Sequence, residues 1–208
     1  MMHKTFLGIY TVALGILFGV VAYAQKPDVS KGESAYKPVA TLQELMSSIV
    51  DPNVDPIWNS VSTISTKEGT IEKKPQTDEE WLALRKHALT LIEVSNLLVI
   101  EGRPVAASGA NTSSHVTELS PKDIQKAIHA NRDGFVKNAH ALQDAAKLTL
   151  AAIDAKDADE LVKAGGKVEH ACEQCHSQFW YPNDKRPTAS LDIGLKPGSS
   201  LYMKMRNS

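Results

Sequence analysis

Cysteine, aromatic residues and net charge are all scarce in this sequence of 208 residues. It contains two cysteines, 6% aromatic residues and a formal net charge of −1. Two thiols are too few for a disulfide-stapled scaffold, a four-thiolate zinc site or a cysteine-held iron–sulfur cluster. Lys and Arg form no cluster, and nucleic-acid binding needs a concentrated basic surface that displaces counterions. The composition therefore argues against a nucleic-acid partner.

Long hydrophobic runs are absent after the first two dozen residues. Lys4 precedes an almost wholly apolar stretch over 6–21, and Ala22 and Ala24 are the small residues that a signal peptidase reads. The stretch is shorter than the roughly 20 residues that span a bilayer, which disfavours the alternative of a retained anchor. We predict a signal peptide over 1–24, cleaved after Ala24, and export to the periplasm. The only expected membrane contact is through this segment if it stays uncleaved.

Composition divides the remaining chain into three parts. Residues 25–38 are polar and contain prolines and glycine, which predicts a flexible lead-in. Residues 39–181 form the predicted folded domain. Prolines and glycines recur in residues 182–208, which predicts an irregular C-terminal tail.

Four segments begin with residues that cap helix N-termini. In a capping box, a side-chain oxygen accepts a bond from a free amide of the first turn while a glutamate three positions later reaches back. A proline directly after a cap is also favourable, because its missing N–H costs nothing there. The starts are Thr41-x-x-Glu44, Thr77-x-x-Glu80, Ser120-Pro121 and Asp157-x-x-Glu160.

Apolar residues recur at three- and four-residue steps after each start, which predicts four amphipathic helices. The expected apolar faces cover 42–64, 81–98, 124–153 and 161–179. We expect the first helix to be kinked or broken where prolines follow Asp51 and Asp55, and the third to be one long helix. No strand-like alternation competes. The predicted fold class is all-α, an antiparallel four-helix bundle, because no helix buries its apolar face alone.

The pentapeptide Cys172-Glu-Gln-Cys175-His176 matches the C-x-x-C-H signature of covalent haem attachment. Two thiols three residues apart lie on one face of a helix, where each can add to a vinyl group of the same haem. The adjacent imidazole is then placed to bind the iron. The motif predicts one covalently bound haem c per chain, with Cys172 and Cys175 as anchors and His176 as the proximal iron ligand.

Other interpretations of the cysteine pair stay open. A thioredoxin-like redox pair belongs at a helix start in a βαβ context, whereas this pair lies deep in the fourth predicted helix. A zinc site formed by Cys172, Cys175, His170 and His176 has unusual histidine spacing. A disulfide across two intervening helical residues would be strained. A haem-free thiol or zinc protein is therefore the weaker alternative.

The second axial position of the iron needs a ligand from elsewhere, because His170 lies on the same helix and faces away. Met46 lies on the apolar face of the first predicted helix, and we assign it as the distal ligand; core packing is the competing interpretation. Met203 and Met205, in the tail, are weaker candidates.

Several residues receive secondary roles. The aromatic run after the motif is expected to shield the porphyrin edge, to close the base of the bundle, or both. Two basic residues in the tail are weak candidates for pairing with haem propionates, and three helical histidines are expected to be surface or core residues. These sets are Phe179, Trp180 and Tyr181; Lys185 and Arg186; and His87, His129 and His140.

A haem motif on the last helix of such a bundle, with Met46 on the first, resembles the cytochrome c-prime family, the class II cytochromes c. The resemblance covers residues 38–181. Low-spin members of that family use a first-helix methionine as the second axial ligand and transfer electrons. High-spin members leave that face open and bind small gases such as nitric oxide. Met46 is similar to the low-spin arrangement, and Trp180 stands where many gas-binding members have a basic residue.

The resemblance implies a periplasmic monohaem electron-transfer cytochrome, not an enzyme, with iron held by His176 and Met46. The alternative is a high-spin protein that binds nitric oxide or carbon monoxide. The expected partners are periplasmic redox proteins that the sequence does not identify. Pairing of two copies as a homodimer is compatible with such a bundle, although the sequence points to no particular face.

Overall fold

The computed structural model describes residues 36–111 and 115–184. The predicted signal peptide (1–24), most of the lead-in (25–38) and most of the tail (182–208) lie outside these residues. Their boundaries stay predictions.

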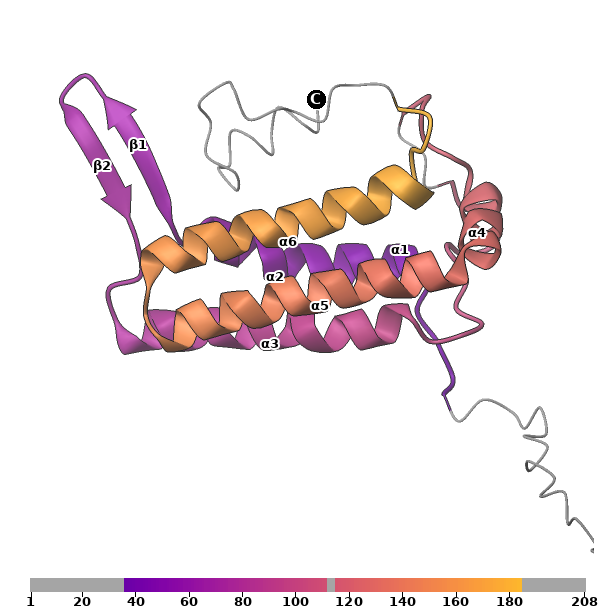
Figure 1. Cartoon of the computed structure of the whole chain (residues 1–208), viewed down its shortest axis with the longest axis horizontal. Helices are drawn as coiled ribbons and strands as arrows, with labels where there is room; N and C mark the ends of the chain where they lie inside the picture. The colour runs from indigo at the N-terminus through magenta and orange to yellow at the C-terminus, as the bar shows by residue number, and fades with distance from the viewer. Residues whose placement is uncertain (1–35, 112–114, 185–208) are drawn as a thin grey trace, which may run out of the picture. The chain divides into compact units, whose positions relative to one another are not determined.

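The described part of the chain is mostly helical, which confirms the all-α class. Figure 1 shows four long segments side by side, a shorter helix across one end and a hairpin at the other. The elements are α1 (Leu42–Leu45), the π turn η1 (Met46–Val50), α2 (Asp51–Trp58), β1 (Ser62–Thr66), β2 (Gly69–Lys73), α3 (Asp78–Leu98), α4 (Pro121–Ala130), α5 (Arg132–Asp154) and α6 (Ala158–Phe179).

The predicted helix starts are confirmed. Thr41 Oγ1 accepts a bond from the amide of Glu44 at 3.1 Å, and the Glu44 carboxylate accepts one from the Thr41 amide at 2.8 Å. Thr77 begins α3 with the same reciprocal pair. Ser120 caps α4, and Asp157 accepts two amides at the start of α6. These bonds satisfy amides that lack partners within the helix.

The core lies between four packed segments. α2 packs against α3 and α6, while α5 packs against α3 and α6, and neighbours run in opposite directions (Figure 1). The largest fully buried side chains come from α2, α3, α4, α5 and α6: Ile57, Leu91, Ile124, Ile153 and Leu161.

One hydrogen bond ties α2 to α6 inside this core. The indole Nε1 of Trp58 donates to the carbonyl oxygen of Gly165 at 3.1 Å. A Cβ atom on Gly165 would lie 3.3 Å from Trp58 Cδ1, which is tighter than ordinary van der Waals contact. The absence of a side chain at Gly165 therefore lets the indole approach the backbone of α6.

The prediction of one long third helix is wrong. The segment is divided at Asn131, whose φ of −135° and ψ of 60° are not helical. Asn131 ends α4 and caps α5, because its side chain accepts a bond from the amide of Gly134 at 3.1 Å. α4 consequently turns across the end of the other helices (Figure 1).

The first helical segment also differs from the prediction. Its α-helical pattern is interrupted by the π turn before Pro52, whereas Pro56 lies within α2. The helix ends at Trp58, so it does not continue to Ile64.

Ile64 instead lies in β1, which pairs antiparallel with β2, although no strand was predicted. Ile64 faces Ile71 across the hairpin, and these side chains are 55% and 58% exposed. The hairpin therefore contributes little to the core. Its sequence signal is the β-branched run of Ser62–Thr66, which was assigned to the end of a helix.

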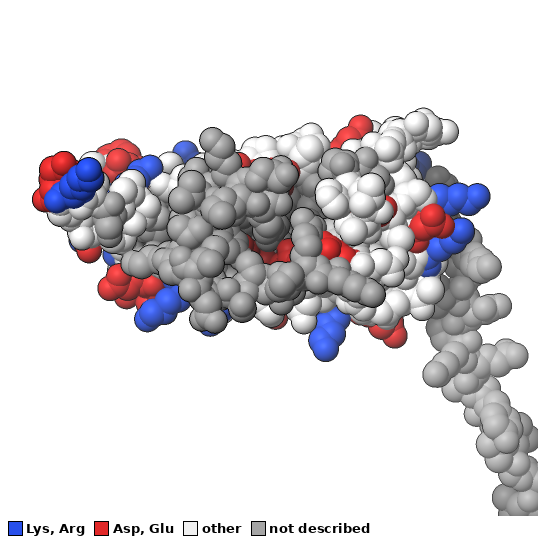
Figure 2. Space-filling model, turned by 90° about the horizontal axis from the view of Figure 1, so that it is seen from above, with Lys and Arg blue, Asp and Glu red and all other residues white. Residues whose placement is uncertain are grey.

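Among the described residues, no helix is both long and apolar enough to cross a membrane. Figure 2 shows both basic and acidic side chains around the margins of the visible part of this face. This distribution agrees with the near-zero net charge.

Candidate functional site

The last two turns of α6 carry the C-x-x-C-H motif. Cys172 and Cys175 are half-buried, are not joined by a disulfide, and both pack against the hydrophobic core. His176 lies in the last turn and is half-buried. The helical spacing thus places both thiols on one face, with the imidazole directly after them. Two reduced thiols and a neighbouring imidazole are the donor set that covalent attachment of a haem requires.

The backbone of His176 accepts two hydrogen bonds at the C-terminal end of α6. Its carbonyl oxygen accepts bonds from the amides of Trp180 at 2.7 Å and Tyr181 at 3.0 Å. The Trp180 and Tyr181 rings lie 6.1 and 6.3 Å from the imidazole, measured between ring centroids. Tyr181 also donates from its hydroxyl to the Glu173 carboxylate at 2.8 Å. Two aromatic rings therefore flank the imidazole, and one is hydrogen-bonded to the motif itself.

Phe179 points to a different place from the other two aromatic residues. It is buried, and its ring meets that of Phe135 edge to face, with centroids 5.6 Å apart. Nearby, Asn138 on α5 donates to the side chain of Gln178 at 2.8 Å. Phe179 thus closes the base of the core, while Trp180 and Tyr181 lie beside His176.

The environment of the thiols disfavours a redox-active pair. Burial raises the pKa of the Cys175 thiol to about 12. Reactive cysteine pairs have lowered pKa values and lie at helix N-termini, where the helix dipole stabilises a thiolate. The Cys175 thiol is instead neutral and sits near a helix C-terminus.

The described ranges, 36–111 and 115–184, contain no cluster of side chains that would support the zinc alternative. No group of three or more His, Cys, Asp or Glu side chains there is arranged to hold a metal ion. His170, the fourth ligand that this alternative needs, is exposed on α6.

Met46 begins the π turn η1. Its side chain is half-buried and packs against the core. Its carbonyl oxygen accepts the amide of Asp51, five residues on, which is the bond that defines a π turn. η1 packs against α3, and Figure 1 shows α1 at the same end of the helices as the C-terminus of α6. The first segment and the motif therefore lie at the same end of the fold.

A pair of side chains that carried no predicted role holds the same turn. The amide nitrogen of Asn53 donates to the Ile49 carbonyl at 2.7 Å, and its oxygen lies 2.8 Å from Nδ1 of His87 on α3. Sequence reasoning missed this link because Asn53 and His87 are 34 residues apart. Only the packing of η1 on α3 brings them together.

Other predicted candidates lie elsewhere. His129 and His140 are exposed on α4 and α5. Met203, Met205, Lys185 and Arg186 lie outside the described residues.

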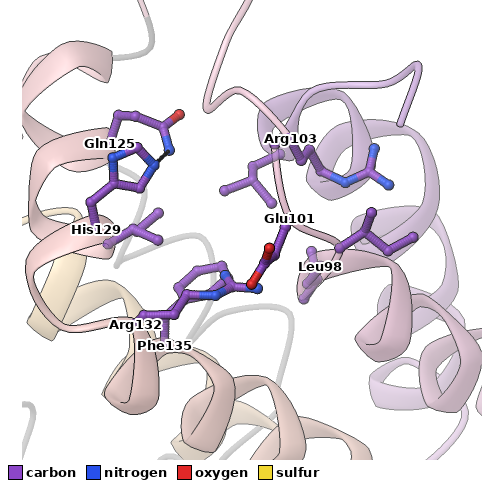
Figure 3. A pocket seen from close by; sticks show the side chains of 11 residues that line it. Leu98, Glu101, Arg103, Gln125, His129, Arg132 and Phe135 are labelled. Atoms are coloured by element: carbon purple, nitrogen blue, oxygen red, sulfur yellow. Dashed lines mark hydrogen bonds between the residues drawn. The ribbon is translucent and has the colours of Figure 1, made fainter. Parts of the chain in front are cut away.

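A cavity of about 290 Å³ lies near this end of the helices, between the end of α3, α4 and the start of α5 (Figure 3). Its lining includes Phe135 but neither Met46 nor any residue of the motif. Arg103 lines it with its stem, while its guanidinium donates to the carbonyls of Leu97, at 3.0 Å, and Ala40. Arg132 donates to the carbonyl of Val99. Both arginines thus cap the C-terminal end of α3.

Comparison with known proteins gives one match. The model of the family described as Cytochrome C′ (cytochrome c-prime) matches residues 103–180, which include α4, α5, α6 and the complete motif. No curated protein and no solved structure matches the chain in the corresponding comparisons. The matched family is one of c-type haem proteins. The match begins at residue 103 and therefore does not include Met46.

Proposed function

We propose that this chain, whose residues 103–180 match the model of the cytochrome c-prime family, is a member of that family and a periplasmic monohaem cytochrome that transfers electrons and is not an enzyme. Export by residues 1–24 is part of this proposal, because covalent haem attachment follows export. Its partners would be periplasmic redox proteins.

The motif on α6 would hold the haem. Cys172 and Cys175 are the thioether anchors, and their half-buried thiols on one helical face, which form no disulfide, fit that role. His176 is the proximal ligand. When bound, the haem supplies an iron that alternates between ferrous and ferric states. Trp180 and Tyr181 flank the imidazole and limit the access of water to it.

Met46 is the distal ligand in this proposal, and its position is the observation that carries the function. It is a half-buried thioether side chain in a segment that lies at the same end of the fold as the motif. A thioether favours the reduced iron relative to harder donors and so raises the reduction potential. An iron with both axial positions filled also has no open position for a gas, which separates electron transfer from gas binding.

The absorption spectrum of the purified oxidised protein tests the proposal. A methionine–iron bond gives a weak charge-transfer band at the far-red end, and a six-coordinate iron gives a low-spin spectrum. Met46→Ala should remove that band, produce a high-spin spectrum and let the ferrous protein bind carbon monoxide readily. Ile49→Ala is the matched control, because Ile49 is also a half-buried η1 residue packed against the core.

Each alternative predicts a different result. A high-spin wild-type spectrum, with rapid carbon monoxide binding, would favour the gas-binding function and overturn electron transfer by Met46 ligation. A low-spin spectrum that survives Met46→Ala would assign the distal ligand to another residue. A colourless protein, made in a host that attaches haem, would favour the thiol or zinc alternative.

A further inference from the structure

The π turn in the first segment has to be held in place by something outside itself. A π turn is rarer than an α-helical turn and occurs mostly as a single interruption inside an α-helix. Pro52 lies two residues after the end of the turn and supplies no backbone N–H, so one carbonyl of η1 loses its helical donor. The local sequence is therefore compatible with a π turn, but it does not by itself favour a π turn over other backbone geometries.

Asn53 supplies one tie within the segment. Its side-chain Nδ2 donates to the Ile49 carbonyl inside η1 at 2.7 Å. Because that nitrogen is the donor, the other end of the amide is an oxygen and faces His87 at 2.8 Å. His87 Nδ1 must therefore carry a hydrogen and donate to it.

The link also reaches across the fold. Asn53 lies in α2 and bonds back to η1, while His87 lies on α3, the helix against which η1 packs. Both side chains are half-buried. Together they form a bridge from the π turn to a 21-residue helix whose start is capped at Thr77.

The setting of this turn decides which way the residues before it face. Successive residues of an α-helix are rotated by about 100° around its axis. Conversion of the π turn into an α-helical turn shifts the register by one residue. Met46 and α1 would then rotate by about that angle relative to α2, and the thioether would leave its present face.

We propose that Asn53 and His87 are positioning residues for Met46, which act by holding the π turn in register. The inference rests on the proposed function, because it assumes that Met46 binds the iron. It goes beyond that function by assigning the stability of the methionine–iron bond to a hydrogen-bonded bridge on the far side of the turn. Neither residue belongs to the ligand set.

The carbon monoxide affinity of the ferrous, haem-loaded full chain measures the stability of the methionine–iron bond directly, because the gas must displace Met46. A loosened methionine competes less well, so the apparent dissociation constant for carbon monoxide falls. Asn53→Ala should lower it by about three- to tenfold, which is the loss of one to two hydrogen bonds expressed as an equilibrium constant. The far-red charge-transfer band should weaken in parallel. Met46→Ala sets the upper limit of the change.

Two further variants separate positioning from packing. His87→Gln keeps a donor for the Asn53 oxygen and should retain most of the wild-type behaviour, whereas His87→Phe keeps a ring and should reproduce Asn53→Ala. Ser47→Ala is the matched control, since it removes an exposed side-chain bond to the Gln43 carbonyl in the same segment without touching the bridge. It should leave the carbon monoxide affinity unchanged.

The outcomes distinguish this inference from the proposed function. Lack of the far-red band in the wild type would refute Met46 ligation, and this inference with it. A wild type that has the band, combined with Asn53→Ala and His87→Phe variants that lower only the thermal unfolding midpoint, would refute positioning and leave the ligation intact. Equal effects of His87→Gln and His87→Phe would likewise refute the hydrogen-bonded bridge.

Discussion

The C-terminal helices α4–α6 and the N-terminal segment from Thr41 to Trp58 supply opposite parts of the candidate site by different means. In α6 the two thiols and the imidazole are neighbours in sequence, and one regular helix presents them together. In the N-terminal segment, Met46 lies in an interrupted helix whose geometry depends on contacts with α3. The family match covers the first region and not the second. The proposed attachment residues are thus neighbours in sequence, whereas the proposed ligation by Met46 depends on packing between distant segments.

The largest effect should come from removing the thiols. We expect the double variant Cys172→Ala, Cys175→Ala to lose all covalently bound haem, because no other cysteine is present. Mass spectrometry of the denatured protein measures attachment. Met46→Ala is the counterpart from the other region and should keep the full haem mass while its spectrum changes. Loss of covalent haem in Met46→Ala would break the division between the two regions.

A smaller effect tests the bond that joins the regions. Trp58→Phe removes the indole donor to the Gly165 carbonyl and some buried volume, and should lower the free energy of unfolding by about 1–3 kcal/mol. Trp81→Phe is the matched control, since Trp81 is also buried and its indole donates no hydrogen bond within the described residues. The Trp58 variant should be the less stable by about 1 kcal/mol in denaturant unfolding. Equal losses would mean that packing alone joins α2 to α6.

The smallest effects should come from the helix caps. Thr41→Ala and Asp157→Ala each remove a side-chain acceptor at a helix start and should cost about 1 kcal/mol of unfolding free energy. Only Thr41 precedes the π turn, so only its variant should also raise the carbon monoxide affinity of the ferrous protein. A matching change in the Asp157 variant would show that general loosening, and not the N-terminal segment, controls access to the iron.

Much of the fold follows from short-range patterns. The four caps and the apolar steps that follow them predicted where helices begin, and the structure confirms each start. The break at Asn131 was missed because apolar residues continue in phase on both sides of it. The hairpin was missed because Ile64 continues the helical spacing of the first segment, although its side chain is largely exposed. Periodicity reports which residues are apolar and not whether the backbone between them is continuous.

The sequence by itself determined the helical class, the helix starts and the grouping of Cys172, Cys175 and His176, because each depends on residues within one or two turns of each other. Tertiary structure alone decided that Met46 begins a π turn, that α2 binds α6 through Trp58, and that Asn53 meets His87. The two hydrogen bonds join residues 107 and 34 positions apart, and the π turn packs against the distant helix α3. Only the packing of whole helices brings such residues within hydrogen-bonding distance.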